Sequence, residues 1–381
     1  MKKNLTLLFY DFEEFHFGKD VFLVPYYLGI LYDYSVTIVY PQKNPDQVFP
    51  AFYKNVRLLP VKCYGDKNNI NIKDLNLAIY LLKHAKEIDC LMRFHNTPMT
   101  ALIVILYKLL NPKGYAYVKM DINPYEIENS TTKHDKLYRC LYSKYIQRLD
   151  LVSCETTEAF QKLQKSQSFF FNFKDKLILM PNGFDEQSLK ELNIKELSFS
   201  EKKNMIITVG RLGTAQKNTE MFLKALEKTD LKDWTVCMIG PIENHFQLYI
   251  DQFFEKYPHK KKNILFTGAI YDKKTLWEYY NQAKVFVLTS DFESYALVLN
   301  EAKRFKNYII STPVGACLDL IENNKYGTTV GINDHKELAD KLQQIIYGNA
   351  NINVYDNYDS HRLSWEYIIK HIPFDKGHIS K

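Results

Sequence analysis

The fold is decided by one segment in the second half of the chain, Met205-Ile-Ile-Thr-Val-Gly-Arg-Leu-Gly-Thr-Ala-Gln-Lys-Asn218. It begins with an apolar, β-branched run and turns at a glycine. It then enters Thr219 to Lys228, where the apolar residues share one face at helical spacing. A buried strand followed directly by an amphipathic helix predicts a right-handed βαβ unit and a parallel sheet.

The same alternation of strands and helices continues along the whole chain. In the second half, further strands are predicted at Trp234 to Ile239, Ile264 to Thr267, Val285 to Thr289 and Tyr308 to Ser311. In the first half, strands are predicted at Leu5 to Phe9, Val36 to Val39, Asp89 to Phe94, Tyr115 to Met120, Leu149 to Cys154 and Leu177 to Met180. Helices are predicted there at Lys19 to Tyr32, Ile72 to Lys86, Pro98 to Leu110 and Asp135 to Gln147. We therefore predict an α/β protein with two doubly wound, Rossmann-like domains.

The length of 381 residues also indicates two domains, because a chain this long is too large to fold around one ordinary hydrophobic core. The polar stretch Asp185 to Lys203 has little to bury, so it is the predicted linker. The predicted domains are residues 1–185 and 186–355. A tail of residues 356–381 follows, in which Ser364 to His371 is a candidate last helix.

The composition is that of an ordinary globular protein. Hydrophobic residues make up 46% and charged residues 25%, and 50 Lys and Arg against 44 Asp and Glu give a formal charge of +6. Disordered, collagen-like and coiled-coil proteins are excluded. The longest nearly apolar run, Thr100 to Leu110, rises only about 16 Å as a helix, too short to cross a bilayer. Pro98 to Leu110 is apolar on nearly every side, so it is either a buried helix, which we favour, or part of a surface that docks on lipid.

The cysteines and the N-terminus indicate a cytoplasmic protein. The six cysteines are widely spaced and never form a Cys-x-x-Cys pair, which argues against a zinc site and a disulfide framework. Lys2 and Lys3 precede only a short apolar run with no small-residue cleavage site after it. We therefore expect a first strand there and not a secretory signal.

Several common catalytic motifs are absent from the sequence. They are Asp-x-Asp, His-Glu-x-x-His, Gly-x-Ser-x-Gly and Gly-x-x-x-x-Gly-Lys-Ser/Thr. Nucleotide sugars held by a metal, zinc proteolysis, serine hydrolysis and P-loop phosphoryl transfer therefore lack their usual residues.

A candidate anion site lies in the run Leu288-Thr-Ser-Asp-Phe-Glu-Ser-Tyr-Ala-Leu-Val-Leu-Asn-Glu-Ala302, which leaves a predicted strand and enters a helix. The helix is predicted to start at Glu293 or Ser294. The amides of Tyr295, Ala296 and Leu297 then point outward from the positive end of the helix dipole, where they can bind phosphate oxygens.

Two glutamates of this run lie eight residues apart, which is about 12 Å along a helix. Glu293 and Glu301 can thus accept hydroxyls at opposite ends of a nucleotide diphosphate and its sugar, one carboxylate at each end. The alternative is that Glu293 is a helix-terminal residue favoured by the dipole and that Glu301 is solvated.

Two cations follow the strand of the opening segment. Gly210 permits a tight turn, and Arg211 and Lys217 come before the next helix. Because loops at the carboxyl ends of parallel strands face the ligand crevice, both cations can reach one diphosphate. The alternative is that they are loop charges in water.

These two constellations together resemble glycosyltransferase family 4, whose members are retaining enzymes of the GT-B fold. The matching residues are Gly210-Arg211-Leu212 through Lys217, with Glu293 and Glu301 separated by seven residues. Further matches are Pro181-Asn182-Gly183-Phe184-Asp185, Phe266-Thr267-Gly268 and Thr312-Pro313-Val314-Gly315, so that the likeness covers about residues 175 to 345.

The resemblance implies two Rossmann-like domains facing across a cleft, the first binding an acceptor and the second a nucleotide-sugar donor. It implies that the tail forms a helix crossing back to the N-terminal domain. It also implies that Arg211 and Lys217 bind the donor diphosphate and that Glu293 contacts the donor sugar. Glu301 is expected to bind the ribose, and the backbone at Ile270 to touch the base. A donor linked to UDP or GDP is expected, with no obligatory metal and no other cofactor.

The N-terminal half matches this family less well. Members often have a glycine-rich loop after the first strand, where this chain offers Gly18 as a donor-binding candidate and Lys19 as a weaker acceptor candidate. Many members place a histidine after the strand Tyr115 to Met120, where this chain has Asp121. This aspartate either orients an acceptor hydroxyl or donor sugar, or caps a turn before Pro124.

Two further acceptor candidates close the strand that begins at Asp89. Arg93 and His95 alternate along it and are expected on one face, either as a polar wall or as structural residues. Ala296 stands where the family often has glycine, and its methyl is expected to crowd the phosphate.

We expect the protein to transfer a hexosyl group, with the acceptor attacking the same face of the donor sugar that the diphosphate leaves. The acceptor implied by the resemblance is a saccharide or a lipid-linked saccharide of bacterial cell-surface polysaccharide synthesis, and no nucleic acid is expected. The protein is then cytoplasmic, either free or peripheral to the inner face of the membrane. The alternatives are an idle GT-B subunit that binds a partner or acceptor protein, and an enzyme similar to a nucleotide-sugar 2-epimerase.

Overall fold

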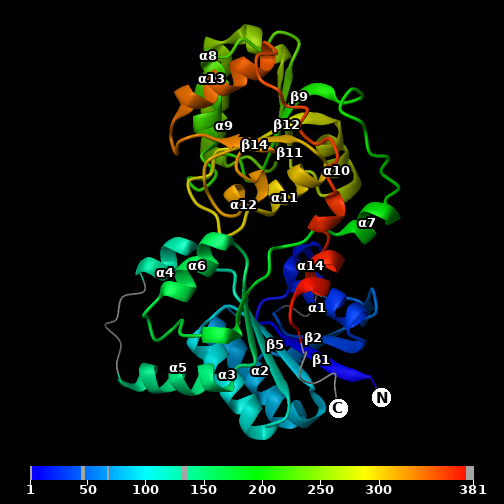
Figure 1. Cartoon of the computed structure of the whole chain (residues 1–381), viewed down its shortest axis with the longest axis vertical. Coiled ribbons are helices and arrows are strands. Elements are labelled where there is room, and N and C mark those ends of the chain that lie inside the picture. Colours follow the sequence, from blue (N-terminus) through cyan, green and yellow to red (C-terminus); the bar gives the residue numbers. More distant parts are fainter. Residues whose placement is uncertain (1, 44–47, 67, 130–135, 375–381) are drawn as a thin grey trace. The chain divides into compact units, whose positions relative to one another are not determined.

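The computed structural model describes residues 2–43, 48–66, 68–129 and 136–374 (Figure 1). The chain forms two compact units, one of Met1–Asp185 with Ser364–Lys381 and one of Glu186–Leu363. Each is an α/β unit around its own sheet, so the predicted fold class of two Rossmann-like domains is confirmed.

The first unit is built on an eight-stranded sheet in the order β3-β4-β2-β1-β5-β6-β7-β8. Its strands are β1 (Lys3–Leu8), β2 (Tyr34–Gln42), β3 (Phe52–Tyr53), β4 (Val56–Lys62), β5 (Cys90–Phe94), β6 (Tyr115–Lys119), β7 (Leu151–Cys154) and β8 (Leu177–Leu179). All neighbours pair in parallel except β3 and β4, which are antiparallel. The order reverses between β1 and β5, which is the usual ligand position in such sheets.

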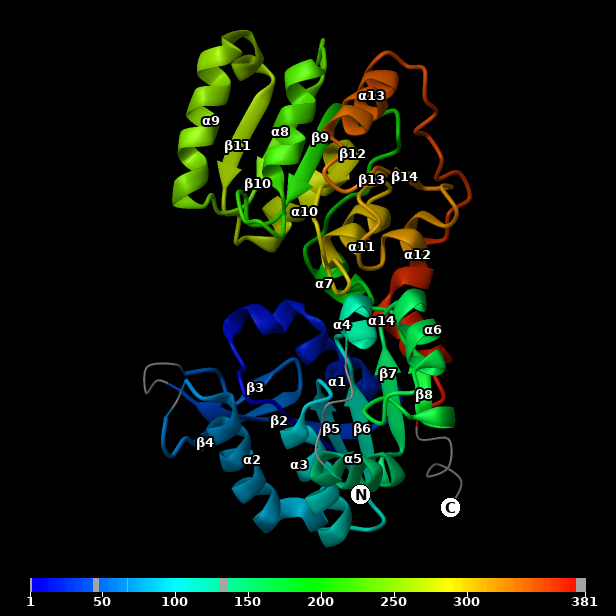
Figure 2. The same cartoon turned by 90° about the vertical axis from the view of Figure 1, so that its left-hand side faces the viewer.

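Helices cover both faces of this sheet. On one face lie α1 (Asp20–Leu31) and α14 (Trp365–His371), and on the other lie α2 (Ile70–His84), α3 (Pro98–Leu110) and α5 (Lys136–Arg148). The remaining helical segments are α4 (Pro124–Asn129), α6 (Thr157–Lys165) and the 3-10 turns η1 (Glu14–Gly18), η2 (Ala85–Glu87) and η3 (Lys174–Lys176). Figure 2 shows α2, α3 and α5 side by side against the sheet.

The segment Pro181 to Asp185 seats the C-terminal helix α14. A Cβ on Gly183 would lie 2.6 Å from Cδ2 and 2.7 Å from Cα of Trp365, so only glycine lets the two backbones approach. The Trp365 amide bonds the Phe184 carbonyl at 3.2 Å, and Tyr27 donates its hydroxyl to Asp185 Oδ1 at 3.1 Å. The motif therefore holds α14 in the core beside α1.

The second unit has a six-stranded parallel sheet in the order β11-β10-β9-β12-β13-β14. Its strands are β9 (Lys203–Val209), β10 (Thr235–Ile239), β11 (Ile264–Gly268), β12 (Ala283–Leu288), β13 (Tyr308–Ser311) and β14 (Gly327–Thr329). Its helical segments are α7 (Glu186–Glu191), α8 (Thr219–Lys228), α9 (Asn244–Lys256), η4 (Pro258–Lys262), α10 (Lys273–Gln282), α11 (Leu297–Arg304), α12 (Cys317–Ile321), α13 (His335–Ile346) and η5 (Ser360–Leu363). The order is that of a dinucleotide-binding sheet, and it reverses between β9 and β12.

The apolar helix α3 is buried on one side only. Ala101, Val104 and Tyr107 lie in the core, whereas Leu102 is 48% and Leu109 62% exposed. The predicted burial thus holds for one side of the helix, and docking of the other side on lipid stays a prediction. Every helix in the described part of the chain is too short or too polar to span a bilayer.

Candidate active site

The two loops predicted to carry the site meet at the point where the second sheet reverses its order. One follows β9 and leads to α8, and the other follows β12 and leads to α11. The Asp291 amide donates to the Gln216 carbonyl at 2.8 Å, and the Thr289 hydroxyl donates to the Lys217 carbonyl at 3.0 Å. The loops therefore form one continuous surface at the carboxyl ends of β9 and β12.

Lys217 and Glu293 form an ion pair at the centre of this surface. The Lys217 Nζ lies 2.5 Å from Glu293 Oε1, and the carboxylate is buried. Two more donors reach it, the Ser290 hydroxyl at 2.7 Å and the Gln216 side-chain amide at 3.3 Å. Sequence reasoning missed Ser290 and Gln216, although Ser290 lies only two residues past β12.

Gly210 and Arg211 complete the loop after β9. A Cβ on Gly210 would lie 3.4 Å from Lys217 Cε, so the lysine stem packs on the glycine backbone. Arg211 is exposed, and within the described residues it makes no ion pair. The structure thus brings Lys217 and Glu293 together and leaves one cation beside them. That both cations bind one diphosphate stays a prediction.

The helix after Glu293 begins later than predicted. The sequence indicated Glu293 or Ser294 as its start, but α11 begins at Leu297 and its N-cap is Ala296. Ala296 has φ +69°, a left-handed conformation that an L residue rarely adopts, and this turn delays the helix. Ser294 and Tyr295 therefore lie in the loop, and the amides at the helix start that can face a ligand belong to Leu297 and Val298, because the Leu299 amide donates to the Ala296 carbonyl at 2.9 Å.

The loop after β13 supports the segment that precedes α11. Gly315 has φ +55°, and a Cβ on it would lie 2.6 Å from the Tyr295 carbonyl oxygen. The Ala316 amide donates to that carbonyl at 2.8 Å, and the Thr312 hydroxyl donates to the Ser290 carbonyl at 2.5 Å. The motif Thr312 to Gly315 thus fixes both ends of the loop that carries Glu293.

Glu301 is not solvated, which corrects one of the two alternatives for it. It lies on α11 and its Oε1 accepts a hydrogen bond of 3.0 Å from Trp277 Nε1 on α10. Burial raises the pKa of the Glu301 carboxyl, and the Trp277 hydrogen bond partly opposes the shift. The residue is therefore part of the contact between α10 and α11.

Ile270 lies in the loop between β11 and α10, after Gly268 at φ +72°. This loop follows the carboxyl end of β11 and thus leaves the same edge of the sheet as the two loops above. The residue is half-buried.

A buried lysine, Lys202, binds the carboxyl ends of α10 and α11. Lys202 is 5% exposed, and its ammonium donates to the carbonyls of Asn281 at 2.8 Å, Ala283 at 2.9 Å and Phe305 at 2.8 Å. Asn307 donates to the Ala283 carbonyl from the other side at 2.6 Å. Lys202 thus supplies a donor to carbonyls at the negative ends of both helices, and the Ala283 carbonyl has Asn307 as a second donor.

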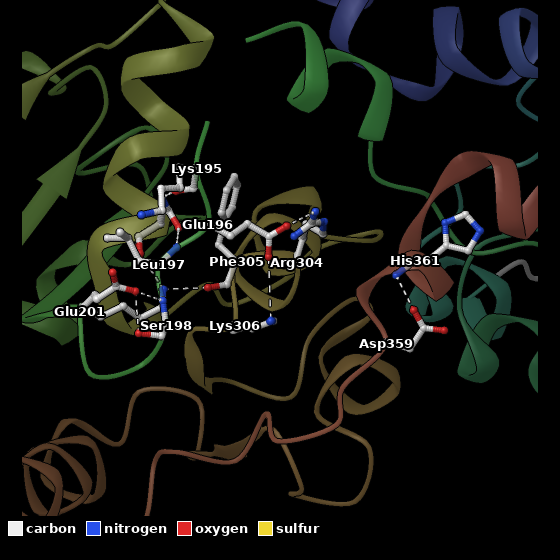
Figure 3. Close-up of polar contacts among 12 residues, drawn as sticks. Lys195, Glu196, Leu197, Ser198, Glu201, Arg304, Phe305, Lys306, Asp359 and His361 are labelled. Atoms are coloured by element: carbon white, nitrogen blue, oxygen red, sulfur yellow. Dashed lines mark hydrogen bonds and ion pairs between the residues drawn. The ribbon is translucent and has the colours of Figure 1, made fainter. Parts of the chain in front are cut away.

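The last turn of α11 is also tied to the start of the second unit. Arg304 is buried and pairs with Glu186 of α7. It also pairs with Glu196, its Nη2 lying 2.8 Å from Glu196 Oε1 (Figure 3). Lys306 lies 3.9 Å from Oε2 of the same Glu196. The segment predicted as a polar linker is thus held against α11.

In the first unit, a buried charged cluster lies at the carboxyl edge of the sheet. Lys119, the last residue of β6, is fully buried; its Nζ lies 2.7 Å from Asp20 Oδ2 and also pairs with Glu155 after β7. Asn182 donates to Glu155 Oε1 at 3.0 Å. Sequence reasoning missed this cluster, although a charged residue at the end of each of two apolar runs was a visible signal.

Burial acts on this cluster in two directions. It raises the pKa of the Glu155 carboxyl to about 8, and the nearby Lys119 only partly opposes the shift. Burial alone would lower the pKa of Lys119, but Asp20 and Glu155 raise it well above its usual value. Lys119 therefore stays charged, and Glu155 keeps its proton more readily than an ordinary glutamate.

Asp121 and His95 lie near this cluster, after β6 and β5. His95 has φ +63°, and its amide donates to the Lys119 carbonyl at 2.9 Å. Burial lowers the pKa of the His95 imidazole, and Asp121 opposes the shift. Asp121 is exposed, so it is free to face a ligand.

Gly18 and Lys19 lie together at the entrance to α1. A Cβ on Gly18 would meet no heavy atom within 4 Å, so the space beside it is open. Lys19 is the N-cap of α1, and its ammonium lies 4.4 Å from the ring centroid of the exposed Phe15.

Arg93 cannot contact a ligand, which corrects its place among the acceptor candidates. It is 1% exposed, and its guanidinium donates to Asp74 Oδ1 and to the Leu8 carbonyl, both at 2.6 Å. The predicted alternation with His95 fails because β5 ends at Phe94 and the chain turns at His95.

Among the residues the structure describes, no group of three or more His, Cys, Asp or Glu side chains lies in a position to hold a metal ion. Metal independence stays a prediction.

Comparison with known proteins shows what the second unit resembles. Residues 190–359 match the family model described as "Glycosyl transferases group 1". A probable sucrose-phosphate synthase of Thermosipho melanesiensis is 30% identical over 177 residues, 45% of this chain and 40% of that protein. The chain thus spans less than half of this relative.

A second relative comes from Campylobacter jejuni. It is GalNAc-alpha-(1->4)-GalNAc-alpha-(1->3)-diNAcBac-PP-undecaprenol alpha-1,4-N-acetyl-D-galactosaminyltransferase, 28% identical over 214 residues, 53% of this chain and 54% of that protein. Among solved structures, Alr3699/HepE of Anabaena in complex with UDP and glucose has a TM-score of 0.65 and 13% identity. The match covers 97% of this chain and 96% of that one. The fold is therefore the GT-B fold with two Rossmann-like domains.

Proposed function

We propose that this protein is a retaining hexosyltransferase that moves a sugar from a UDP- or GDP-linked donor to a saccharide or lipid-linked acceptor. The observation that carries the proposal is the Lys217–Glu293 pair at the strand-order reversal of the second sheet, with the unpaired Arg211 beside it. A site that combines two cations with the start of α11 suits a diphosphate.

The comparisons support this proposal. The matched family model covers the second unit, which contains these residues. The Campylobacter relative is named for a transfer to an undecaprenol-linked saccharide, and the Anabaena structure contains UDP and glucose. We extend these features to the present chain and place its role in bacterial cell-surface polysaccharide synthesis.

The proposed reaction is a same-face transfer. The bond from the anomeric carbon to the diphosphate oxygen breaks, and the acceptor hydroxyl attacks the same face of the sugar. The leaving diphosphate oxygen takes the hydroxyl proton. Arg211, Lys217 and the amides at the start of α11 stabilise the negative charge that grows on the leaving group, which removes the need for a metal.

The remaining roles follow the positions of the side chains. Glu293, fixed by Lys217 and Ser290, would accept a hydroxyl of the donor sugar, and Glu301 would accept the ribose hydroxyls. In the first unit, Asp121 is proposed to orient the reacting hydroxyl, and His95, kept neutral by burial, to bind the acceptor. Gly18 and Lys19 are proposed to border the donor and acceptor.

A donor screen tests this function. A panel of UDP- and GDP-sugars is scored for release of free nucleotide, with and without saccharide acceptors, and for protection against heat. At 100 times its Kd, the true nucleotide should add about 2.7 kcal/mol and raise Tm by roughly 5 °C.

The Lys217→Ala variant is the control for this screen, because it should lose the heat protection while keeping its fold. If no nucleotide raises the Tm of the wild-type protein, the proposal is wrong. Protection without turnover on any acceptor would instead indicate the idle-subunit alternative.

A further inference from the structure

The outer sides of α2, α3 and α5 present apolar side chains to solvent. On α2, Leu75, Ile79 and Leu82 are 55%, 41% and 56% exposed, and their spacing of four and three residues places them on one side of the helix. On the neighbouring α3, Leu102 and Leu109 are seven residues apart and 48% and 62% exposed. The buried sides of both helices lie in one core, so these outer sides form a common surface.

The same three helices carry cations but no exposed carboxylate. Their sequences contain a single acidic residue, Asp74 on α2, which is 1% exposed and bound to Arg93. Exposed cations are Lys83 at the end of α2 and Lys136, Arg139 and Lys144 on α5. The surface is therefore apolar and positively charged.

The charge of the whole chain is distributed in the same way. The first unit contains 27 Lys and Arg against 21 Asp and Glu, whereas the second contains 23 of each. The entire formal charge of +6 thus belongs to the unit that exposes the apolar helices.

We propose that the outer face of α2, α3 and α5 docks on the surface of an anionic lipid bilayer. The leucines and Ile79 would enter the boundary between headgroups and acyl chains, while the cations bind anionic headgroups. Neither a long helix nor a covalent lipid is needed, because apolar area and charge act together.

The chemistry of the face favours lipid over other occupants. A second copy of this chain would bring the same cations opposite one another in a symmetric contact, and no carboxylate lies on the three helices to offset them. Protein interfaces are depleted in lysine at their apolar core, whereas here lysines accompany the leucines. A lipid surface supplies both an apolar layer and negative charge.

Vesicle flotation of the full-length protein tests the proposal without any sugar substrate. Vesicles of phosphatidylcholine with 30% phosphatidylglycerol are compared with vesicles of phosphatidylcholine alone, at low salt and at 1 M NaCl. The protein should float with the anionic vesicles at low salt, and both high salt and neutral lipid should release it.

Two variants separate the apolar and electrostatic parts. Leu102→Ser/Leu109→Ser and Lys136→Ala/Arg139→Ala/Lys144→Ala should each reduce the bound fraction at limiting lipid by about tenfold or more. The matched controls lie in the second unit. Leu248→Ser/Leu265→Ser has similar exposure, 63% and 51%, and Lys261→Ala/Lys262→Ala/Lys336→Ala removes three exposed cations. Both controls should float like wild type.

Each other outcome overturns the proposal. No flotation of folded wild-type protein, equal binding to neutral vesicles, or equal losses in the controls would exclude this face as a lipid-binding surface. A mass in light scattering that falls to the monomer in the leucine variant would assign the face to self-association instead. Heat protection by nucleotides is measured in parallel on every variant, so a failed donor site and a failed lipid surface are recognised separately.

Discussion

Lys217 makes three contacts that together shape the candidate site. Its stem covers Gly210, its carbonyl accepts the Thr289 hydroxyl, and its ammonium binds Glu293. In the proposed reaction, the donor diphosphate would share that ammonium with the carboxylate, whereas the exposed Arg211 would be available at once. We therefore expect Arg211 to attract the donor and Lys217 to align it.

The two cations should both be essential for turnover. Arg211→Ala or Lys217→Ala should lower kcat/KM by roughly two orders of magnitude or more, because each removes a preorganised donor to the leaving diphosphate. The measurement is steady-state transfer with the donor identified by the screen, with urea unfolding as the check on folding.

Lys224→Ala is the matched control for these cations. Lys224 lies on α8, its side chain is 45% exposed, and it pairs with Glu220 at the surface. Its turnover should equal that of wild type. Near-normal turnover in both Arg211→Ala and Lys217→Ala would contradict their assignment.

The backbone of Ala296, just before α11, is strained because it is left-handed. Its φ of +69° costs an alanine roughly 1 kcal/mol, and a β-branched side chain costs more. Ala296→Gly should therefore be neutral or stabilise the protein by up to about 0.5 kcal/mol, because the gain in the folded state offsets the larger entropy of unfolded glycine. Ala296→Val should destabilise it by about 1–2 kcal/mol. Urea unfolding measures both, and a more stable valine variant would contradict the left-handed geometry.

The helices α10 and α11 act as a pair that holds Glu301. Trp277 on α10 bonds Glu301 on α11, and Lys202 joins the carboxyl ends of both helices. The position of Glu301 therefore depends on a lysine that binds one turn further along both helices, at Asn281 and Phe305.

Removal of the Lys202 ammonium should loosen this pair. Lys202→Met should lower the free energy of unfolding by about 3 kcal/mol, because the Asn281 and Phe305 carbonyls lose this donor inside the protein, while Ala283 keeps Asn307. It should also raise the KM for the nucleotide sugar more than it lowers kcat, since Glu301 contacts the ribose in the proposed site.

The exposed Lys261 provides the control for this change. Lys261→Met should alter unfolding by less than about 0.5 kcal/mol, as usual for a surface substitution. An equally stable Lys202→Met variant would show that the carbonyls find other partners.

The sequence predicts most strands and the position of the candidate site, because both depend on apolar periodicity and on loops at strand ends. It fails for β3 and β4, since β3 has only two residues and β4 buries few of its side chains around Pro60. It also fails at the start of α11, where Glu293 and Ser294 have the residue types of a helix start. Nothing in the sequence signals the left-handed turn at Ala296. Long-range contacts such as Lys119 with Glu155 depend on which strands become neighbours, which periodicity does not fix.

The two units share one design, in which a parallel sheet reverses its strand order and polar side chains gather at its carboxyl edge. Each side of the connection between them is anchored within its own unit, Asp185 by Tyr27 and Glu186 by Arg304. The edges differ in charge. The second unit places Lys217 against one carboxylate, whereas the first buries Lys119 against both Asp20 and Glu155. Burial of Glu155 in this cluster, with Asp20 as a second carboxylate nearby, makes the stability of the protein depend on pH.

Glu155 should set that dependence between pH 5 and 8. Its folded pKa of about 8 lies above the ordinary value of 4.5, so the folded state binds more protons than the unfolded state across this range. The contribution of Glu155 to the free energy of unfolding therefore falls as pH rises, with a slope of up to about 1.4 kcal/mol per pH unit. Glu155→Gln keeps an acceptor for Lys119 and Asn182 but does not titrate, so the stability of this variant should decline less from pH 5 to pH 8.

Urea unfolding at several pH values measures the difference. Glu158 on α6 is exposed, so Glu158→Gln is a control whose stability should change with pH as that of wild type does. If the Glu155→Gln and wild-type curves are parallel, Glu155 ionises like an exposed glutamate and burial does not raise its pKa.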